Sequence, residues 1–169
     1  MSANAVSAAS ALLFHHESAT RKTVDRNNHR VFCQKWRNYL FKELLRDKIE
    51  KNYFFTDKKL DILLVGDSSF GKFEDSVHNI ANYCINNDYN VNINLNTDDL
   101  NIDDKTDILI SFTENYDIKN INARKNIIKI LVYSKDKFNQ NNNDYDIFIE
   151  ETNNLGEVII SEICSTYLD

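Results

Sequence analysis

The segment most informative about the architecture is Leu60-Asp61-Ile62-Leu63-Leu64-Val65-Gly66. This nearly continuous aliphatic run ends at a glycine, a pattern typical of a strand that is buried on both faces of a parallel sheet. Residues 90–95, 107–112, 127–132 and 145–149 also have strand-like composition. Apolar residues recur with helical spacing at 73–86 and at 155–167. We therefore predict an α/β fold with a Rossmann-like, doubly wound and mostly parallel sheet of about five strands.

A long amphipathic helix is predicted before this sheet. From Asn28 to Ile49, apolar residues recur at spacings of three to five, and an extended segment at 11–16 precedes them. The charge balance changes just after this helix. Residues 1–60 contain 12 Lys and Arg against 6 Asp and Glu, whereas residues 61–169 contain 8 against 20. Such a change in composition marks a change of unit, so we predict one unit at 1–59 and an α/β domain at 60–169.

The composition excludes several kinds of site. The chain has only 3 glycines, Gly66, Gly71 and Gly156, which is too few for a dinucleotide fingerprint or a P-loop. The acidic second unit argues against a nucleic-acid partner, because that affinity comes largely from neutralising phosphates. No apolar run approaches the roughly 20 residues of a transmembrane segment. The 3 cysteines lie far apart, which argues against a zinc cluster and suits a reducing compartment, so we expect a cytoplasmic protein.

The most specific motif lies in the first unit. Its sequence is Leu13-Phe14-His15-His16-Glu17-Ser18-Ala19-Thr20-Arg21, and Phe32 and Lys35-Trp36 follow it on the predicted helix. Imidazole is the commonest metal ligand, and a guanidinium group suits a diphosphate. In an extended segment the two imidazoles point to opposite faces, so only one enters a given site. The residues alone leave open a metal site and a pair of surface histidines.

This motif resembles the C-terminal end of the GT-A-fold glycosyltransferases of the large family-2 group. There, a Leu-Tyr-His-His-Glu-Ser-x-Ser-Arg motif closes the catalytic domain, and a helix with a Phe and a Lys/Arg-Trp pair follows. The resemblance covers residues 11–55. It implies that His15, with His16 as second choice, ligates the divalent cation, Mn²⁺ or Mg²⁺, that holds the donor diphosphate, and that Arg21 lies near that diphosphate. The family's Asp-x-Asp motif and catalytic base would precede this segment, so we expect a fragment.

Residues 60–169 resemble, more loosely, the N-terminal half of GT-B-fold glycosyltransferases. The similarity lies in the first strand, in the helix with Asn79-Ile80-Ala81 and in the strand that Tyr89-Asn90-Val91 opens. In such enzymes this half mainly contacts the acceptor. Together the two resemblances imply a fragment of a bacterial glycosyltransferase of cell-surface polysaccharide synthesis. Its partners would be a nucleotide-diphosphate sugar and a glycan acceptor, and we expect it to be inactive alone.

Ligands of open α/β sheets bind at the carboxyl ends of the strands. Two loops are predicted at that edge, one after the first strand and one after the third. A ligand of this unit is therefore expected there, and the resemblance to the GT-B half implies that it is the acceptor, bound by Gly66, Asp67, Ser68, Ser69 and Glu114. An Asp-x-Asp sequence also occurs at 144–146, where we interpret it as the start of a strand.

Two alternatives stay open. Gly66-Asp67-Ser68 resembles the nucleophile block of SGNH ester hydrolases, in which Ser68 would attack an ester after activation by a histidine. That family places an Asp-x-x-His near the C-terminus, whereas no histidine follows His78 here. The other alternative is a non-catalytic α/β interaction module that docks a partner on a sheet edge and on the amphipathic helix.

Overall fold

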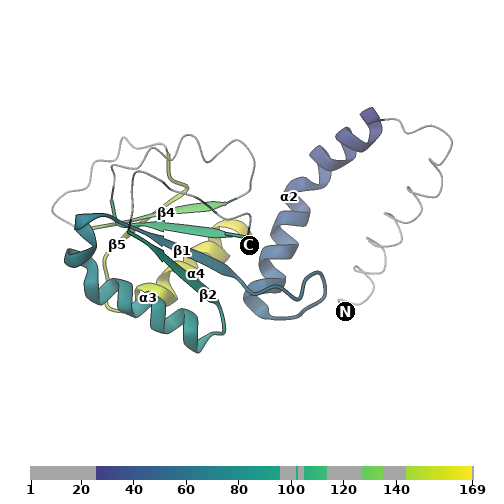
Figure 1. Cartoon of the computed structure of the whole chain (residues 1–169). Helices are drawn as coiled ribbons and strands as arrows, with labels where there is room; N and C mark the ends of the chain where they lie inside the picture. Colours follow the sequence, from purple (N-terminus) through teal and green to yellow (C-terminus); the bar gives the residue numbers. More distant parts are fainter. Residues whose placement is uncertain (1–25, 96–101, 103–104, 114–126, 135–143, 169) are drawn as a thin grey trace.

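The computed structural model describes residues 26–95, 102, 105–113, 127–134 and 144–168 (Figure 1). A parallel sheet lies at its centre, with two helices on one face and a long helix at one end. The elements, in chain order, are α2 (Arg26–Glu50), β1 (Asp61–Val65), the 3₁₀ helix η1 (Ser68–Phe73), α3 (Glu74–Asn86), β2 (Asn90–Asn94), β3 (Ile108–Ser111), β4 (Ile128–Tyr133), β5 (Ile147–Glu150), α4 (Leu155–Ile163) and the π-helical turn η3 (Cys164–Leu168).

The five strands are all parallel and lie in the order β2-β1-β3-β4-β5. In this register Leu63 of β1 lies between Asn92 of β2 and Leu109 of β3. The order is a common one for doubly wound α/β sheets. The predicted Rossmann-like α/β class is confirmed, and the pairing is wholly parallel.

The main hydrophobic core lies between one face of the sheet and helices α3 and α4. These two helices also contact each other, because the backbone N–H of Gly156 donates to Asn79 Oδ1 at 3.0 Å. The alternate strand residues are buried on the opposite face, among them Leu63 and Val65 of β1. Burial on both faces explains why β1 is continuously aliphatic. The main core includes Ile62, Leu64, Val77, Ile80, Cys84, Ile108, Ile110, Ile130, Leu155 and Ile159.

The long helix is confirmed as α2, but only its second half packs against the core. Phe41, Leu45 and Ile49 recur every four residues and contact the main core. Val31 and Tyr39, in contrast, are 58% and 40% exposed. The predicted apolar stripe therefore contacts the core only near its C-terminal end. The extended segment predicted before this helix lies outside the described residues.

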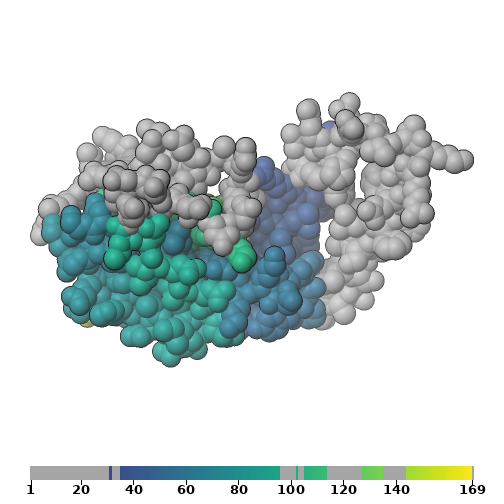
Figure 2. All heavy atoms as spheres, viewed as in Figure 1, coloured from purple at the N-terminus to yellow at the C-terminus, as the bar shows by residue number. Residues whose placement is uncertain are grey.

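Helix α2 packs at the amino end of the sheet. Tyr89, just before β2, donates its hydroxyl to the Ile49 carbonyl at 3.2 Å, and Arg46 donates to the Leu168 carbonyl at 2.9 Å. The carboxyl ends of the strands lie at the other end of the sheet (Figure 1). In Figure 2 the atoms of α3 and β2, in teal, form one continuous surface with α2 beside it in blue. The unit boundary at residue 60 stays a prediction.

No helix in the described part of the chain combines the length and the apolar character needed to cross a membrane.

Candidate functional site

The carboxyl ends of β1 and β3 lie at the point where the strand order reverses. The chain passes from β1 to β2 on one side of the sheet, and from β3 to β4 on the other. The loops that leave β1 and β3 therefore diverge, and such a divergence is where ligands bind in open α/β sheets. Predicted residues Gly66 to Ser69 follow β1 directly, and Phe112 and Thr113 follow β3.

Asp67 is the centre of the polar contacts at this edge. Its Oδ1 accepts the backbone N–H of Ser69 at 2.7 Å, and its Oδ2 accepts the hydroxyl of Thr113 at 3.4 Å. The hydroxyl of Ser69 in turn donates to the Phe112 carbonyl at 3.0 Å. These bonds join two loops that are far apart in sequence. They place a carboxylate beside a hydroxyl at the switch point.

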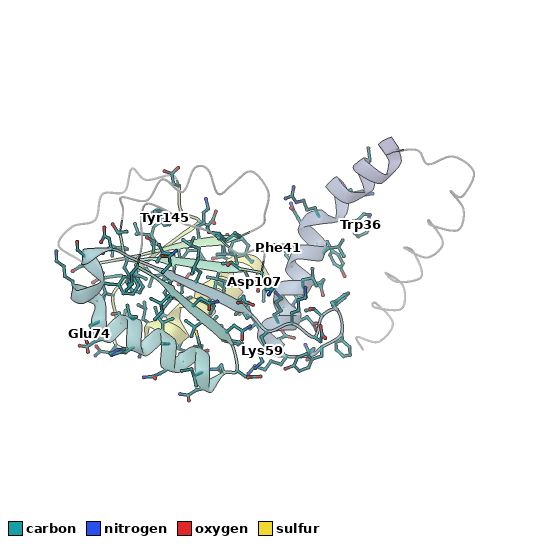
Figure 3. All side chains as sticks on the ribbon, in the orientation of Figure 1. Trp36, Phe41, Lys59, Glu74, Asp107 and Tyr145 are labelled. Atoms are coloured by element: carbon teal, nitrogen blue, oxygen red, sulfur yellow. The ribbon has the colours of Figure 1, made fainter. Side chains whose placement is uncertain are left out.

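The position of Thr113 is fixed from within the domain. Its carbonyl accepts the hydroxyl of Ser111 at 2.7 Å and that of Tyr145 at 3.0 Å. Both donors are buried, as is Thr113 itself. Tyr145, which is labelled in Figure 3, comes from the segment before β5. Contacts from β3 and from the segment before β5 therefore hold the backbone at Thr113, which limits its conformational freedom.

Asp67 is ionised at neutral pH. The hydrogen bonds from Ser69, first from its backbone and then from its side chain, lower the pKa of the Asp67 carboxyl, and the Thr113 hydroxyl adds to this effect. Burial opposes the shift but does not outweigh it. A carboxylate with a lowered pKa is a weak base near pH 7 and acts as a hydrogen-bond acceptor. The geometry therefore suits binding of hydroxyl or ammonium donors better than proton abstraction.

An aromatic ring covers the backbone of Gly66. A Cβ built at Gly66 would overlap the ring of Phe70, so this ring packs where only a glycine leaves room. Phe70 also contacts Phe112 edge-on, with 5.3 Å between ring centroids, and Phe112 contacts Phe73 at the same distance. Three backbone N–H groups of this loop already have acceptors within the domain: that of Gly66 donates to the Asn94 carbonyl at 3.1 Å, that of Ser69 to Asp67 Oδ1 at 2.7 Å and that of Phe70 to the Asp67 carbonyl at 3.0 Å.

The structure brings together only part of the predicted site. Gly66, Asp67 and Ser69 lie in one cluster, whereas the Ser68 side chain is exposed and forms no hydrogen bond with the described residues. Glu114 lies outside the described residues. Thr113 was not among the predicted site residues. The rule that ligands bind at the carboxyl edge of the sheet points to the loop after β3, where Thr113 lies. It does not say which residue of that loop turns toward β1.

The predicted metal and diphosphate residues His15, His16 and Arg21 lie outside the described residues. Within the described part of the chain, no three His, Cys, Asp or Glu side chains gather closely enough to hold a metal ion. The Asp-x-Asp sequence has a structural role, as predicted, because Asp146 Oδ2 accepts the backbone N–H of Lys129 at 2.8 Å just before β5.

Ser68 is not arranged as the nucleophile of an ester hydrolase among the described residues. Such a serine needs a histidine within hydrogen-bond reach. The His78 side chain is exposed on α3, and no hydrogen bond joins it to Ser68. The described geometry therefore offers no base for the Ser68 hydroxyl.

No family model matches this chain, and neither a curated protein nor a solved structure does. The functional argument therefore depends on the residues and on their geometry.

Proposed function

We propose that this chain is part of a nucleotide-sugar-dependent glycosyltransferase and that its α/β domain contacts the acceptor glycan. The observation that carries this proposal is the contact between Asp67 and Thr113 at 3.4 Å across the switch point. A carboxylate accepts hydrogen bonds from sugar hydroxyls, and a threonine hydroxyl both donates and accepts. Asp67 is only partly buried and each carboxylate oxygen can accept more than one hydrogen bond, so it can accept from a sugar hydroxyl while Ser69 and Thr113 hold it in place.

Two features favour an acceptor-binding role over a donor-binding role. The lowered pKa of Asp67 makes its carboxylate a weak base, which suits it to hold a hydroxyl group rather than to deprotonate it. The backbone N–H groups of Gly66, Ser69 and Phe70 already donate to Asn94 and Asp67, so they are not free to bind a diphosphate. The donor is therefore assigned to another part of the enzyme.

The divalent cation enters this proposal only through the resemblance. His15 and His16 have suitable donor atoms for Mn²⁺ or Mg²⁺, and Arg21 suits a diphosphate. A bound cation would neutralise the charge that develops on the leaving diphosphate. We expect little or no transfer by this chain alone, because the resemblance of residues 11–55 is to the end of the family's catalytic domain only. Turnover of a panel of nucleotide sugars with Mn²⁺ measures this, and robust turnover would show the expectation to be wrong.

Acceptor binding is tested by NMR titration of the full chain with a panel of oligosaccharides. We expect shifts in the resonances of residues 66–69 and 111–113 for at least one glycan. Asp67→Ala should weaken binding about tenfold or more, because a hydrogen bond to a charged group contributes roughly 1.5–3 kcal/mol. Asp75→Ala, which removes an exposed carboxylate from α3, serves as the control. If no glycan shifts these resonances, the acceptor role is wrong.

The ester-hydrolase alternative has its own test. An ester-substrate assay compares the wild type with Ser68→Ala, and activity that the substitution abolishes would favour the hydrolase. The described surroundings of Ser68 lead us to expect no such activity.

A further inference from the structure

The edge strand β2 pairs on one side only among the described residues. Toward β1, the Asn90 N–H donates to the Leu60 carbonyl at 2.9 Å, and the Asn94 carbonyl accepts an N–H from the loop after β1 at 3.1 Å. Successive residues of a strand point their backbone groups to alternate sides. The N–H and C=O groups of Val91 and Ile93 therefore point away from β1. Such a row of backbone groups is a template for pairing with a further strand.

Exposed apolar side chains lie along the same edge. Val91 and Ile93 pair in register with two core residues of β1, so they point to the face of the sheet that α3 covers. Val91 packs against the main core, whereas Ile93 is 52% exposed. Leu95, which follows β2 directly, is 65% exposed. The helix-covered face of the sheet therefore has an uncovered apolar margin at β2.

Helix α3 adds one more exposed apolar side chain to this margin. Tyr83 packs against α4, because a Cβ built at Gly156 would overlap its side chain. Ile85 follows two positions later, about 200° around the helix, and so points away from α4. Since α4 follows β5, at the opposite end of the strand order, the side of α3 away from α4 is the side of β2. Ile85 is 67% exposed there, and in Figure 2 the teal atoms of α3 and β2 adjoin on one exposed face.

The β2 edge is uncharged, which distinguishes it from the other edge of the sheet. Residues 89–97 contain no Asp, Glu, Lys or Arg, and the chain contains no proline. Charged residues and prolines are the usual means by which an edge strand avoids pairing with another chain. The other edge strand, β5, ends at Glu150 and is followed by Glu151. Two copies of this acidic domain would therefore bring like charges together at β5 but not at β2.

We infer that β2 pairs antiparallel with β2 of a second copy of this chain, about a two-fold axis at Ile93. From residue 91 to residue 95 apolar residues alternate with asparagine, and this pattern is the same in both directions. An antiparallel pair centred on Ile93 therefore places apolar residues opposite apolar residues and asparagines opposite asparagines. The contact uses the same surface of both copies and closes on itself.

The backbone fits the same register. Ile93 faces Ile93 of the second copy, and Val91 faces Leu95. These are the positions whose backbone groups point outward, so each facing pair exchanges two hydrogen bonds. On the other face of the sheet Asn92 faces Asn94, and amide side chains both donate and accept hydrogen bonds. Backbone pairing and side-chain pairing therefore select the same two-fold axis.

The test is sedimentation velocity of the full chain over a range of protein concentrations. We expect a dimer whose fraction increases with concentration. Ile93→Lys should weaken dimerisation by at least about tenfold, because the dimer loses two apolar side chains and gains two facing like charges. Ile93→Pro should weaken it as well, because it removes the outward N–H and leaves the bonds to β1 intact. Edge strands tolerate a proline at such a position.

The matched control lies on α2. Val31 is 58% exposed, so Val31→Lys also replaces an exposed apolar side chain by lysine, but away from β2. This variant should dimerise as the wild type does. Circular dichroism melting should show that the variants fold, and Ile93→Lys provides the result if the proline destabilises the domain.

Disulfide cross-linking tests the register. In the proposed dimer the two Ile93 Cα atoms lie about 5.5 Å apart, a separation that a disulfide spans. Mild oxidation should therefore link Ile93→Cys into a covalent dimer. Asn90→Cys is the control on the same strand, because its two copies lie six residues out of register, or about 20 Å apart. The wild type measures the background from the 3 native cysteines.

Three results would overturn the inference. A wild type that stays monomeric at every concentration would leave the β2 edge to a strand of a different protein. A dimer that Val31→Lys dissociates as much as Ile93→Lys does would not depend on this edge. Equal cross-linking of Ile93→Cys and Asn90→Cys would rule out the two-fold axis at Ile93. The proposed interface does not include Asp67 or Thr113, so none of these results bears on the acceptor role.

Discussion

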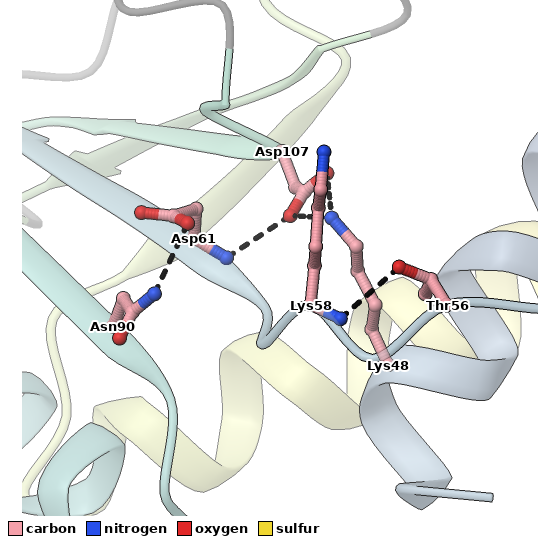
Figure 4. A network of polar contacts seen from close by, with 6 residues as sticks. All are labelled: Lys48, Thr56, Lys58, Asp61, Asn90 and Asp107. Carbon is pink, nitrogen blue, oxygen red and sulfur yellow. Dashed lines mark hydrogen bonds and ion pairs between the residues drawn. The ribbon is translucent and has the colours of Figure 1, made fainter. Parts of the chain in front are cut away.

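Lys48, near the end of α2, binds both carboxylate oxygens of Asp107, the residue before β3, at 2.7 and 2.5 Å. Asp107 Oδ2 also accepts the backbone N–H of Asp61, the first residue of β1, at 3.0 Å (Figure 4). One carboxylate thus joins the helix to two adjacent strands. The side chains of the ion pair are only 12% and 24% exposed. The pair therefore holds α2 at the amino end of the sheet.

Removing this carboxylate should destabilise the domain. Asp107→Ala leaves the Lys48 ammonium and the Asp61 N–H without their acceptor, and we expect a loss of about 2–4 kcal/mol in the free energy of unfolding. Asp107→Asn should cost less, since its amide oxygen can still accept from Asp61. Urea unfolding measures both variants. Lys59→Met, which breaks the exposed pair with Asp88, is the control and should have a smaller effect. Equal losses in Asp107→Ala and Lys59→Met would contradict this account.

Asp47 should make stability depend on pH. Burial by itself raises the pKa of its carboxyl, but the backbone N–H groups of Phe54, Phe55 and Thr56 together outweigh this effect and lower it. A carboxyl whose pKa is lower in the folded state stabilises the fold above its ordinary pKa of about 3.9. This stabilisation is lost as the pH falls from about 5 through the folded-state value.

Asp47→Asn should therefore be less stable by about 2 kcal/mol at pH 7, and it should lose less stability than the wild type on acidification. Urea unfolding at several pH values between 7 and 3 measures both effects. Asp57→Asn, at an exposed position of the same segment between α2 and β1 (residues 51–60), is the control. A wild type and an Asp47→Asn variant with parallel pH profiles would show that the three backbone bonds do not stabilise the carboxylate.

Gly66 and Gly71 should respond differently to alanine. A Cβ at Gly66 overlaps the Phe70 ring, whereas a Cβ at Gly71 meets no atom within 4 Å. Gly66→Ala should displace the ring and lower the free energy of unfolding by about 1–3 kcal/mol. Gly71→Ala should leave stability within about 0.5 kcal/mol or raise it slightly, since alanine restricts the unfolded chain. Thermal and urea unfolding compare the two, and equal effects would rule out close packing of Phe70 over Gly66.

The Cys84 thiol should be unreactive in the folded protein. It is fully buried on α3, and burial raises its pKa to about 11. At pH 8 only about one thiol in a thousand would be ionised, and the thiolate is the reactive form. Iodoacetamide labelling followed by mass spectrometry of the Cys84 peptide should show modification only when denaturant is added. Rapid labelling of this peptide in the native protein would contradict the burial.

Local pattern predicted the elements because the buried strands are mostly aliphatic, with only isolated polar residues such as Ser111 and Lys129. The aliphatic run at 60–66 became β1 at Asp61–Val65, and the helical spacing at 73–86 became α3 at Glu74–Asn86. The same reasoning did not predict which apolar residues of α2 meet the core. Two stripes of similar character occupy opposite sides of this helix, and periodicity alone does not distinguish them.

The candidate site was predicted only as far as its edge of the sheet. Parallel strands bring their carboxyl ends to one edge, which pointed to the loops after β1 and β3. The partner of Asp67 was not predicted, because the turn of the backbone at Thr113 depends on contacts from Ser111 and Tyr145. The structural role of Asp47 was likewise not predictable from the sequence. Its three backbone donors reach the carboxylate only when the segment between α2 and β1 folds back against α2.

Composition and periodicity alone established the α/β class, the run of strands and helices, and the opposite charges of the two parts of the chain. These properties depend on residues that are near one another in sequence, and apolar patterning is sufficient to reveal them. The order of the strands, the side of α2 that meets the domain, and the meeting of Asp67 with Thr113 required the folded chain. Each depends on contacts between residues far apart in sequence, whose relative positions are set by how the sheet and helices pack together.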